Sequence, residues 1–194
     1  ERALPLWTEA LRLQRATRGP DHSDTLTTLN NLAMGYFSAG QYDKSAELHE
    51  EALELLRKAL PPDHPDTLVS MNNLALAYEH AGRREKALRL YEESFRLMNA
   101  RLGADHPGTL TTMNNLAMVY SEKGQKDKAL PLLEQCLQLR KARLGVDHPD
   151  TLQSMNNLAL TYNESGQTDK ALPLLEETLQ LRKRKLGADH PDTL

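Results

Sequence analysis

Apolar residues recur three and four positions apart along two neighbouring stretches of the chain, and each stretch predicts one amphipathic helix. Between Pro65 and Gly82 the apolar side chains fall on one helical face, and they are Leu68, Met71, Leu74, Ala75 and Tyr78. A second helix is predicted over about residues 84–101, with inward positions at Ala87, Leu90, Ser94, Leu97 and Met98. One such helix pair cannot bury its own apolar face, so neighbouring pairs must stack.

The same pattern returns every 42 residues. Asp-His stands at 21–22, 63–64, 105–106, 147–148 and 189–190, and Asn-Asn stands at 30–31, 72–73, 114–115 and 156–157. Residues 105–146 and 147–188 are identical at 29 of 42 positions. The sequence therefore predicts an all-α, right-handed α-solenoid of antiparallel helix pairs. The predicted units are the second helix of a partial repeat at 1–20, four repeats at 21–62, 63–104, 105–146 and 147–188, and the start of a truncated repeat at 189–194.

Helix boundaries follow from the residues between the apolar runs. Pro65 suits the first turn of a helix, and Asp63 is the predicted N-cap, with His64 as the other candidate. Gly82 stands where a left-handed C-cap is expected, and Gly103, Gly145 and Gly187 end the later second helices.

This pattern resembles the tetratricopeptide repeat. The small residue after Leu74 and the aromatic Tyr78 match the first helix of that family, and Ala87 matches its second helix. The 42-residue period, with its "HPDTL…NNLA" signature, is similar to the longer repeats of the kinesin light chain and nephrocystin type. The resemblance implies a TPR-like superhelix that binds a protein or peptide on its concave side, which the first helices line.

Composition narrows the classes of function. A formal net charge of −3 gives no general attraction to nucleic acid or to an anionic membrane, so neither is expected as a partner. No apolar stretch is long enough to span a bilayer, and no signal or transit peptide is visible. The single cysteine, Cys136, excludes an intrachain disulfide and fits a reducing compartment, so we expect a cytoplasmic protein. Because Ser94 and Thr178 occupy the same repeat position, Cys136 is interpreted as a small packing residue.

The His-Pro-Asp tripeptide recurs with the structural period, which indicates a helix start rather than a recognition motif. His22, His64, His106 and His148 are each one repeat apart, at about 10 Å or more, too far to share a zinc ion. No phosphate-binding loop and no nucleophile–base arrangement is present, so we expect neither an enzyme nor a cofactor.

The paired asparagines are the more informative motif. Helical geometry places both members of each pair beside the exposed strip of the first helix, with an apolar residue one turn on. Amides donate and accept hydrogen bonds, so a row of them can hold the main chain of a peptide. The alternative is that one asparagine of each pair bonds a neighbouring helix. The predicted peptide-binding residues are Asn30, Asn31, Asn72, Asn73, Asn114, Asn115, Asn156, Asn157, Leu76, Met118 and Leu160.

Basic runs end two of the second helices. The first comprises Arg140, Lys141 and Arg143, and the second spans residues 182–185. Positive charge at a helix C-terminus complements the helix dipole, so these runs are interpreted as a solvated face rather than a nucleic-acid patch.

The sequence thus favours a protein–protein interaction scaffold. One alternative is a structural array that self-associates head to tail through uncapped ends. Another is a regulatory or sensor segment of a larger multidomain signalling protein. Because the chain begins and ends within a repeat and lacks an initiator Met, we expect it to be a fragment of a longer protein.

Overall fold

The computed structural model describes residues 3–187, which form nine α-helices and no strand. The all-α prediction is therefore confirmed for the described part of the chain. The predicted repeat start at 189–194 lies outside the described residues. The helices are α1 (Ala3–Arg18), α2 (Ser23–Ser38), α3 (Tyr42–Ala59), α4 (Pro65–His80), α5 (Arg84–Leu102), α6 (Pro107–Glu122), α7 (Lys126–Leu144), α8 (Pro149–Glu164) and α9 (Thr168–Leu186).

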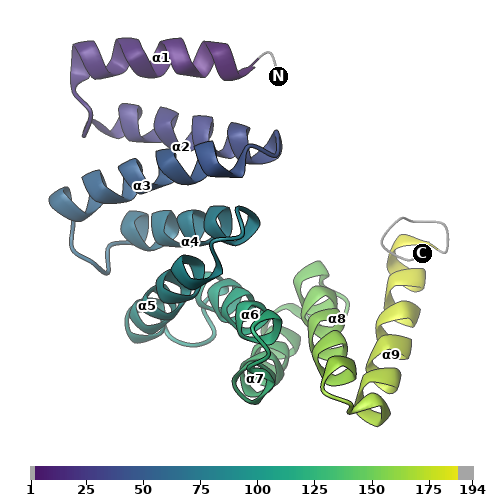
Figure 1. Cartoon of the computed structure of the whole chain (residues 1–194). Helices are drawn as coiled ribbons and strands as arrows, with labels where there is room; N and C mark the ends of the chain where they lie inside the picture. The colour runs from purple at the N-terminus through teal and green to yellow at the C-terminus, as the bar shows by residue number, and fades with distance from the viewer. Residues whose placement is uncertain (1–2, 188–194) are drawn as a thin grey trace. The chain divides into compact units, whose positions relative to one another are not determined.

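The helices divide into two units. Unit 1 runs to Arg101 and holds α1 to α5, whereas unit 2 begins at Leu102 and holds α6 to α9. Within unit 1, α1 packs on α2, α2 on α3, and α3 on α4 (Figure 1). Within unit 2, α6 packs on α7, α7 on α8, and α8 on α9. We call α2, α4, α6 and α8 the first helices, and α1, α3, α5, α7 and α9 the second helices.

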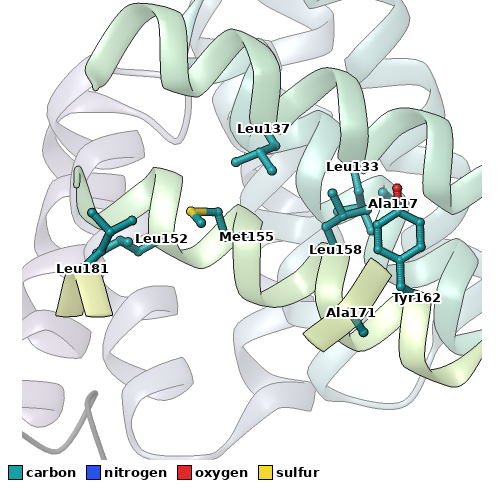
Figure 2. Packing of buried hydrophobic residues seen from close by; sticks show 9 residues of the cluster. All are labelled: Ala117, Leu133, Leu137, Leu152, Met155, Leu158, Tyr162, Ala171 and Leu181. Carbon is teal, nitrogen blue, oxygen red and sulfur yellow. The ribbon is translucent and has the colours of Figure 1, made fainter. Parts of the chain in front are cut away.

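The apolar face predicted for α4 is buried, because Leu68, Met71, Leu74, Ala75 and Tyr78 are all at most 6% exposed. In unit 1 a core cluster joins Leu11 of α1, Leu29 and Leu32 of α2, and Ala52 of α3. The corresponding cluster in unit 2 brings Leu133 and Leu137 of α7 against Met155 and Leu158 of α8 (Figure 2). Within unit 1, α2 lies between α1 and α3, and within unit 2, α8 lies between α7 and α9, so packing covers most of the surface of these two first helices.

The residue that caps each first helix is the histidine. His64 Nδ1 accepts a hydrogen bond from the Asp66 amide at 3.3 Å, and His106 Nδ1 accepts one from the Gly108 amide at 3.1 Å. The prediction of Asp63 as N-cap is therefore wrong, and the other candidate, His64, is confirmed. Asp63 instead pairs with Arg101 of α5 at 2.9 Å. That ion pair turns the carboxylate toward the end of the second helix rather than toward the start of α4.

Glycines end the second helices as predicted. Gly145 follows α7 with φ of 93°, a left-handed conformation that residues with a Cβ rarely adopt. Its amide reaches the Lys141 carbonyl at 3.2 Å, which satisfies one of the free carbonyls of the last turn.

Ion pairs join successive second helices at a constant sequence separation. Arg15 of α1 pairs with Glu51 of α3 at 2.6 Å, and Arg57 of α3 pairs with Glu93 of α5 at 2.9 Å. In unit 2, Lys141 of α7 pairs with Glu177 of α9 at 3.3 Å. We call these three pairs the inter-repeat bridges. They are exposed or half-buried, so each contributes little to stability, about 0–1 kcal/mol.

Candidate functional site

Each first helix leaves one narrow face uncovered, and the second asparagine of its pair lies on that face. We call the set of these positions the amide strip, which comprises Asn31 and Met34 on α2, Asn73 and Leu76 on α4, Asn115 and Met118 on α6, and Asn157 and Leu160 on α8. Met34 and Leu160 are 43% and 44% exposed, high values for large apolar side chains. Asn31 is also exposed, and the other five side chains are half-buried. Several predicted site residues therefore lie at an accessible surface within their own unit.

The first asparagine of each pair lies between helices instead. Asn114 is only 3% exposed, and its Oδ1 accepts hydrogen bonds from Asn157 Nδ2 at 3.2 Å and from Ser154 Oγ at 3.5 Å. The expectation that both asparagines flank the exposed strip is therefore corrected at Asn114, whose amide ties α6 to α8. The alternative interpretation, one amide bonding a neighbouring helix, describes this pair.

The other first asparagines have related but different surroundings. Asn72 Nδ2 approaches Met98 Sδ on α5 at 3.6 Å, and Asn156 is half-buried. Asn30 Oδ1 is buried with no hydrogen-bond partner within the described residues. The same repeat position thus carries a satisfied amide oxygen in α6 and an unsatisfied one in α2.

Arg140 corrects the interpretation of the basic runs as a fully solvated face. Its side chain is only 3% exposed, and its Nη1 donates to Ser154 Oγ and to the Asp150 carbonyl, both at 2.8 Å. The guanidinium therefore links the end of α7 to the start of α8. Burial raises the pKa of the neighbouring Cys136 thiol, whose Sγ donates to the Leu110 carbonyl at 3.4 Å.

Several side chains near the C-terminal ends of the first helices make local contacts. The ring of Phe37 meets that of His80 edge-on, with centroids 4.9 Å apart, and both rings pack on Tyr42. Glu79 accepts a hydrogen bond from the Tyr91 hydroxyl at 3.1 Å. In unit 2, Lys126 pairs with Glu164 and donates to Ser121 Oγ at 2.8 Å. Because of these contacts, fewer of the side chains near the amide strip have hydrogen-bonding groups that are available to a ligand.

Two pockets in unit 1 adjoin predicted site residues. One, of about 430 Å³, lies between α2 and α4 and is lined in part by Asn30. The other, of about 620 Å³, is formed by α1 and α2 and includes Asn31, Met34 and Trp7. Both volumes fall within the range of about 300–1,000 Å³ that is common for ligand pockets.

Sequence reasoning did not select the residues that join Asn30 around the α2–α4 pocket, notably Asp21, Asp66 and Ser70. One feature of the sequence does point to this pocket, namely the residue type at one repeat position of the second helices. Position 56 is Leu, whereas the equivalent positions 98 and 140 are Met and Arg. A repeat position that is apolar in one repeat and cationic in another indicates that the side chains packed around it also differ.

Residues 3–187 contain neither a candidate metal site nor a candidate membrane-spanning helix. Among residues 3–187 no cluster of three or more His, Cys, Asp or Glu side chains is arranged to hold a metal ion. In the same part of the chain no helix combines the length and apolar character that crossing a bilayer requires.

The fold and the open face define an α-solenoid built from repeated helix pairs, a class whose members are typically protein-interaction scaffolds and are generally non-catalytic. Family models described as tetratricopeptide repeat match residues 1–58, 24–100 and 66–142, and a further one matches residues 151–192. The chain therefore belongs to the tetratricopeptide repeat family. A search of curated proteins finds no significant match.

Solved structures agree with this assignment. A Podosopora anserina protein of nearly identical TPR-like repeats, described as a kinesin light chain, is 30% identical, with a TM-score of 0.81 over 95% of this chain and 88% of that one. A point variant of the same protein is 31% identical, with a TM-score of 0.84 over 94% and 86% of the two chains. BtubC (BKLC) from P. vanneervenii, at 21% identity, shares the fold, with a TM-score of 0.78 over 100% of this chain and 76% of that one.

Proposed function

We propose that this chain is an interaction module that binds an extended peptide or a partner segment over the amide strip. The observation that carries the proposal is the repeated open face of the first helices. At the same two positions of each one, an amide and a large apolar side chain remain at least partly accessible, whereas the leucine that directly follows the amide is at most 4% exposed.

The chemistry of the strip suits main-chain recognition. The amides of Asn31, Asn73 and Asn115 can each donate to and accept from a peptide backbone whatever its side chains. Met34 and Leu160 offer apolar contacts beside them. The strip carries no Lys or Arg, so it lacks the cations that an acidic peptide would require.

The test uses a random peptide library displayed on phage and selected on the immobilised chain. Affinities of the selected peptides are then measured by fluorescence anisotropy on wild type and variants. Asn73→Ala removes one amide, and we expect the affinity to fall by about 0.5–1.5 kcal/mol, the net value of an ordinary hydrogen bond.

A matched pair of substitutions separates the strip from the rest of the surface. Leu160→Asp places a charge on the strip, whereas Val146→Asp places one in the α7–α8 connection at similar exposure, 47% against 44%. Selected peptides that contact α8 should lose binding only with Leu160→Asp. If no peptide is selected, or if Asn73→Ala and Leu160→Asp both bind every peptide as wild type does, the proposed function is refuted.

Self-association is a second candidate function, and one observation favours it. Large apolar side chains are exposed on the outermost described helices, with Leu6 at 72% on α1 and Leu172 at 54% on α9. Sedimentation velocity over a wide concentration range tests this candidate. A mass that stays monomeric at every concentration contradicts it, and an assembly that Leu6→Glu dissolves supports it.

A further inference from the structure

The α2–α4 pocket of unit 1 combines an apolar wall with an acidic and hydrogen-bonding lining. Leu26, Leu56, Leu60 and Val69 supply apolar surface, and the polar lining comprises Asp21, Ser23, Thr27, Asn30, His64, Asp66 and Ser70. No Lys or Arg lines it. A cavity with this composition can enclose a long side chain that is apolar along its stem and polar at its tip.

Two residues that line this pocket, Asn30 and Ser70, each carry a buried polar atom without a partner in the described part of the chain. Asn30 Oδ1 and Ser70 Oγ are both buried, and neither makes a hydrogen bond within the described residues. Ser70 as a whole is only 1% exposed. A buried polar atom without a partner is unfavourable, so a ligand that supplies donors to both atoms gains affinity. The amide oxygen can only accept, which specifies a ligand with hydrogen-bond donors.

Unit 2 shows which group satisfies the same positions. Asn114 and Ser154 stand two repeat lengths after Asn30 and Ser70, and there Ser154 Oγ donates to Asn114 Oδ1 at 3.5 Å. Ser154 Oγ in turn accepts from the Arg140 guanidinium at 2.8 Å. The residue equivalent to Arg140 in unit 1 is Leu56, which has no donor to offer. The α2–α4 pocket therefore lacks the guanidinium that completes the equivalent site.

The charges around the pocket favour a cation. The carboxylates of Asp21 and Asp66 line it and remain exposed. His64 Nδ1 is occupied by its capping hydrogen bond from the Asp66 amide at 3.3 Å. The lining is thus net negative beside the two unsatisfied polar atoms.

We propose that this pocket receives an arginine side chain of the bound peptide. This inference rests on the proposed function and specifies the ligand for unit 1. The guanidinium donates to Asn30 Oδ1 and Ser70 Oγ, its charge faces Asp21 and Asp66, and its methylene stem lies along Leu56 and Leu60. An arginine supplied by the ligand thereby replaces the one that unit 2 carries within its own sequence.

The experiment extends the selection described above. Selected peptides are resynthesised with each arginine replaced by citrulline, which has the same shape and no charge. For a peptide bound to unit 1, we expect one such replacement to weaken binding about tenfold or more, as loss of hydrogen bonds with a charged group implies. The double variant Asp21→Asn with Asp66→Asn should weaken the arginine peptide and leave the uncharged citrulline peptide unaffected. Ser70→Ala should weaken both peptides, because citrulline retains N–H donors.

Two further variants sharpen the result. Ser94→Ala is the matched control, because Ser94 is equally buried in unit 1 and its Oγ is also unpartnered, but it does not line the pocket. Its affinities should equal those of wild type. Leu56→Arg introduces the residue of unit 2 and should exclude the arginine peptide by filling the pocket.

Direct binding of a small probe separates this inference from the proposed function. Ethylguanidinium titrated into the ¹⁵N-labelled chain should shift the NMR signals of Asn30 and Ser70 in wild type, and should not do so in the Leu56→Arg variant. Peptides that bind the strip without any arginine dependence, together with no such shift, overturn the inference and leave the proposed function standing. A shift without any selectable peptide supports the pocket chemistry and refutes the proposed function.

Discussion

A single buried histidine should make unit 1 sensitive to mild acid. His49 of α3 is 1% exposed, and burial lowers its pKa from 6.5 to about 4. As the pH falls below 6.5, the unfolded chain binds a proton that the folded chain excludes. The stability provided by neutral His49 is therefore complete above pH 6.5 and is lost progressively as the pH falls toward 4. Between about pH 7 and pH 5, linkage gives a loss of about 2 kcal/mol.

The assay is urea unfolding followed by the fluorescence of Trp7, the single tryptophan, which lies in α1 and so reports on unit 1. The informative variant is His49→Leu, because the equivalent Leu133 is fully buried in unit 2 and shows that leucine is accommodated at this position. We expect the variant to lose about 2 kcal/mol less than wild type between the two pH values. His80→Gln changes an exposed histidine of the same unit and should retain the full loss. An equal loss in wild type and His49→Leu would refute the assignment to His49.

Three further outcomes follow from the contacts described above. Removing the N-cap side chain in His106→Ala should lower the free energy of unfolding, measured with urea, by about 1 kcal/mol. Asp105→Ala should lower it by less, and the reverse order of the two variants would contradict the capping assignment. Cys136, fully buried and with a raised thiol pKa, should react with a thiol reagent only as fast as the protein unfolds, and rapid labelling of the native chain would contradict this. Asn114→Ala should destabilise the chain by about 1–3 kcal/mol, because Asn157 and Ser154 lose their hydrogen-bond acceptor. In thermal unfolding, the matched Asn115→Ala variant should not show this loss of stability.

The fold followed from the sequence because each repeat carries the same local signals in the same order. Helix α4 was expected to begin at Pro65 and to stop before Gly82, and it spans Pro65–His80. The N-cap was misassigned because Asp and His stand side by side and both can accept a backbone hydrogen bond. Asp63 pairs instead with Arg101, which lies 38 residues further on. A local motif cannot reveal a partner at that separation.

The candidate site was less accessible to sequence reasoning. A helical wheel places Asn114 and Asn115 on the polar side of one helix, but it contains no neighbouring helix. The contact between Asn114 and Asn157 arises only when α6 and α8 pack together. Arg140 was misread for the same reason, because its acceptors lie on α8 rather than on its own helix.

The inter-repeat bridges have a consequence for how such a chain can change in length. Each bridge joins the basic residue of one second helix to the acidic residue of the next. Helix α3 carries one partner of each kind, because its Glu51 pairs with Arg15 of α1 and its Arg57 pairs with Glu93 of α5. Duplication of the repeat 21–62 would therefore place Arg57 of one copy opposite Glu51 of the next, and the flanking pairs with Arg15 and Glu93 would keep their matching charges.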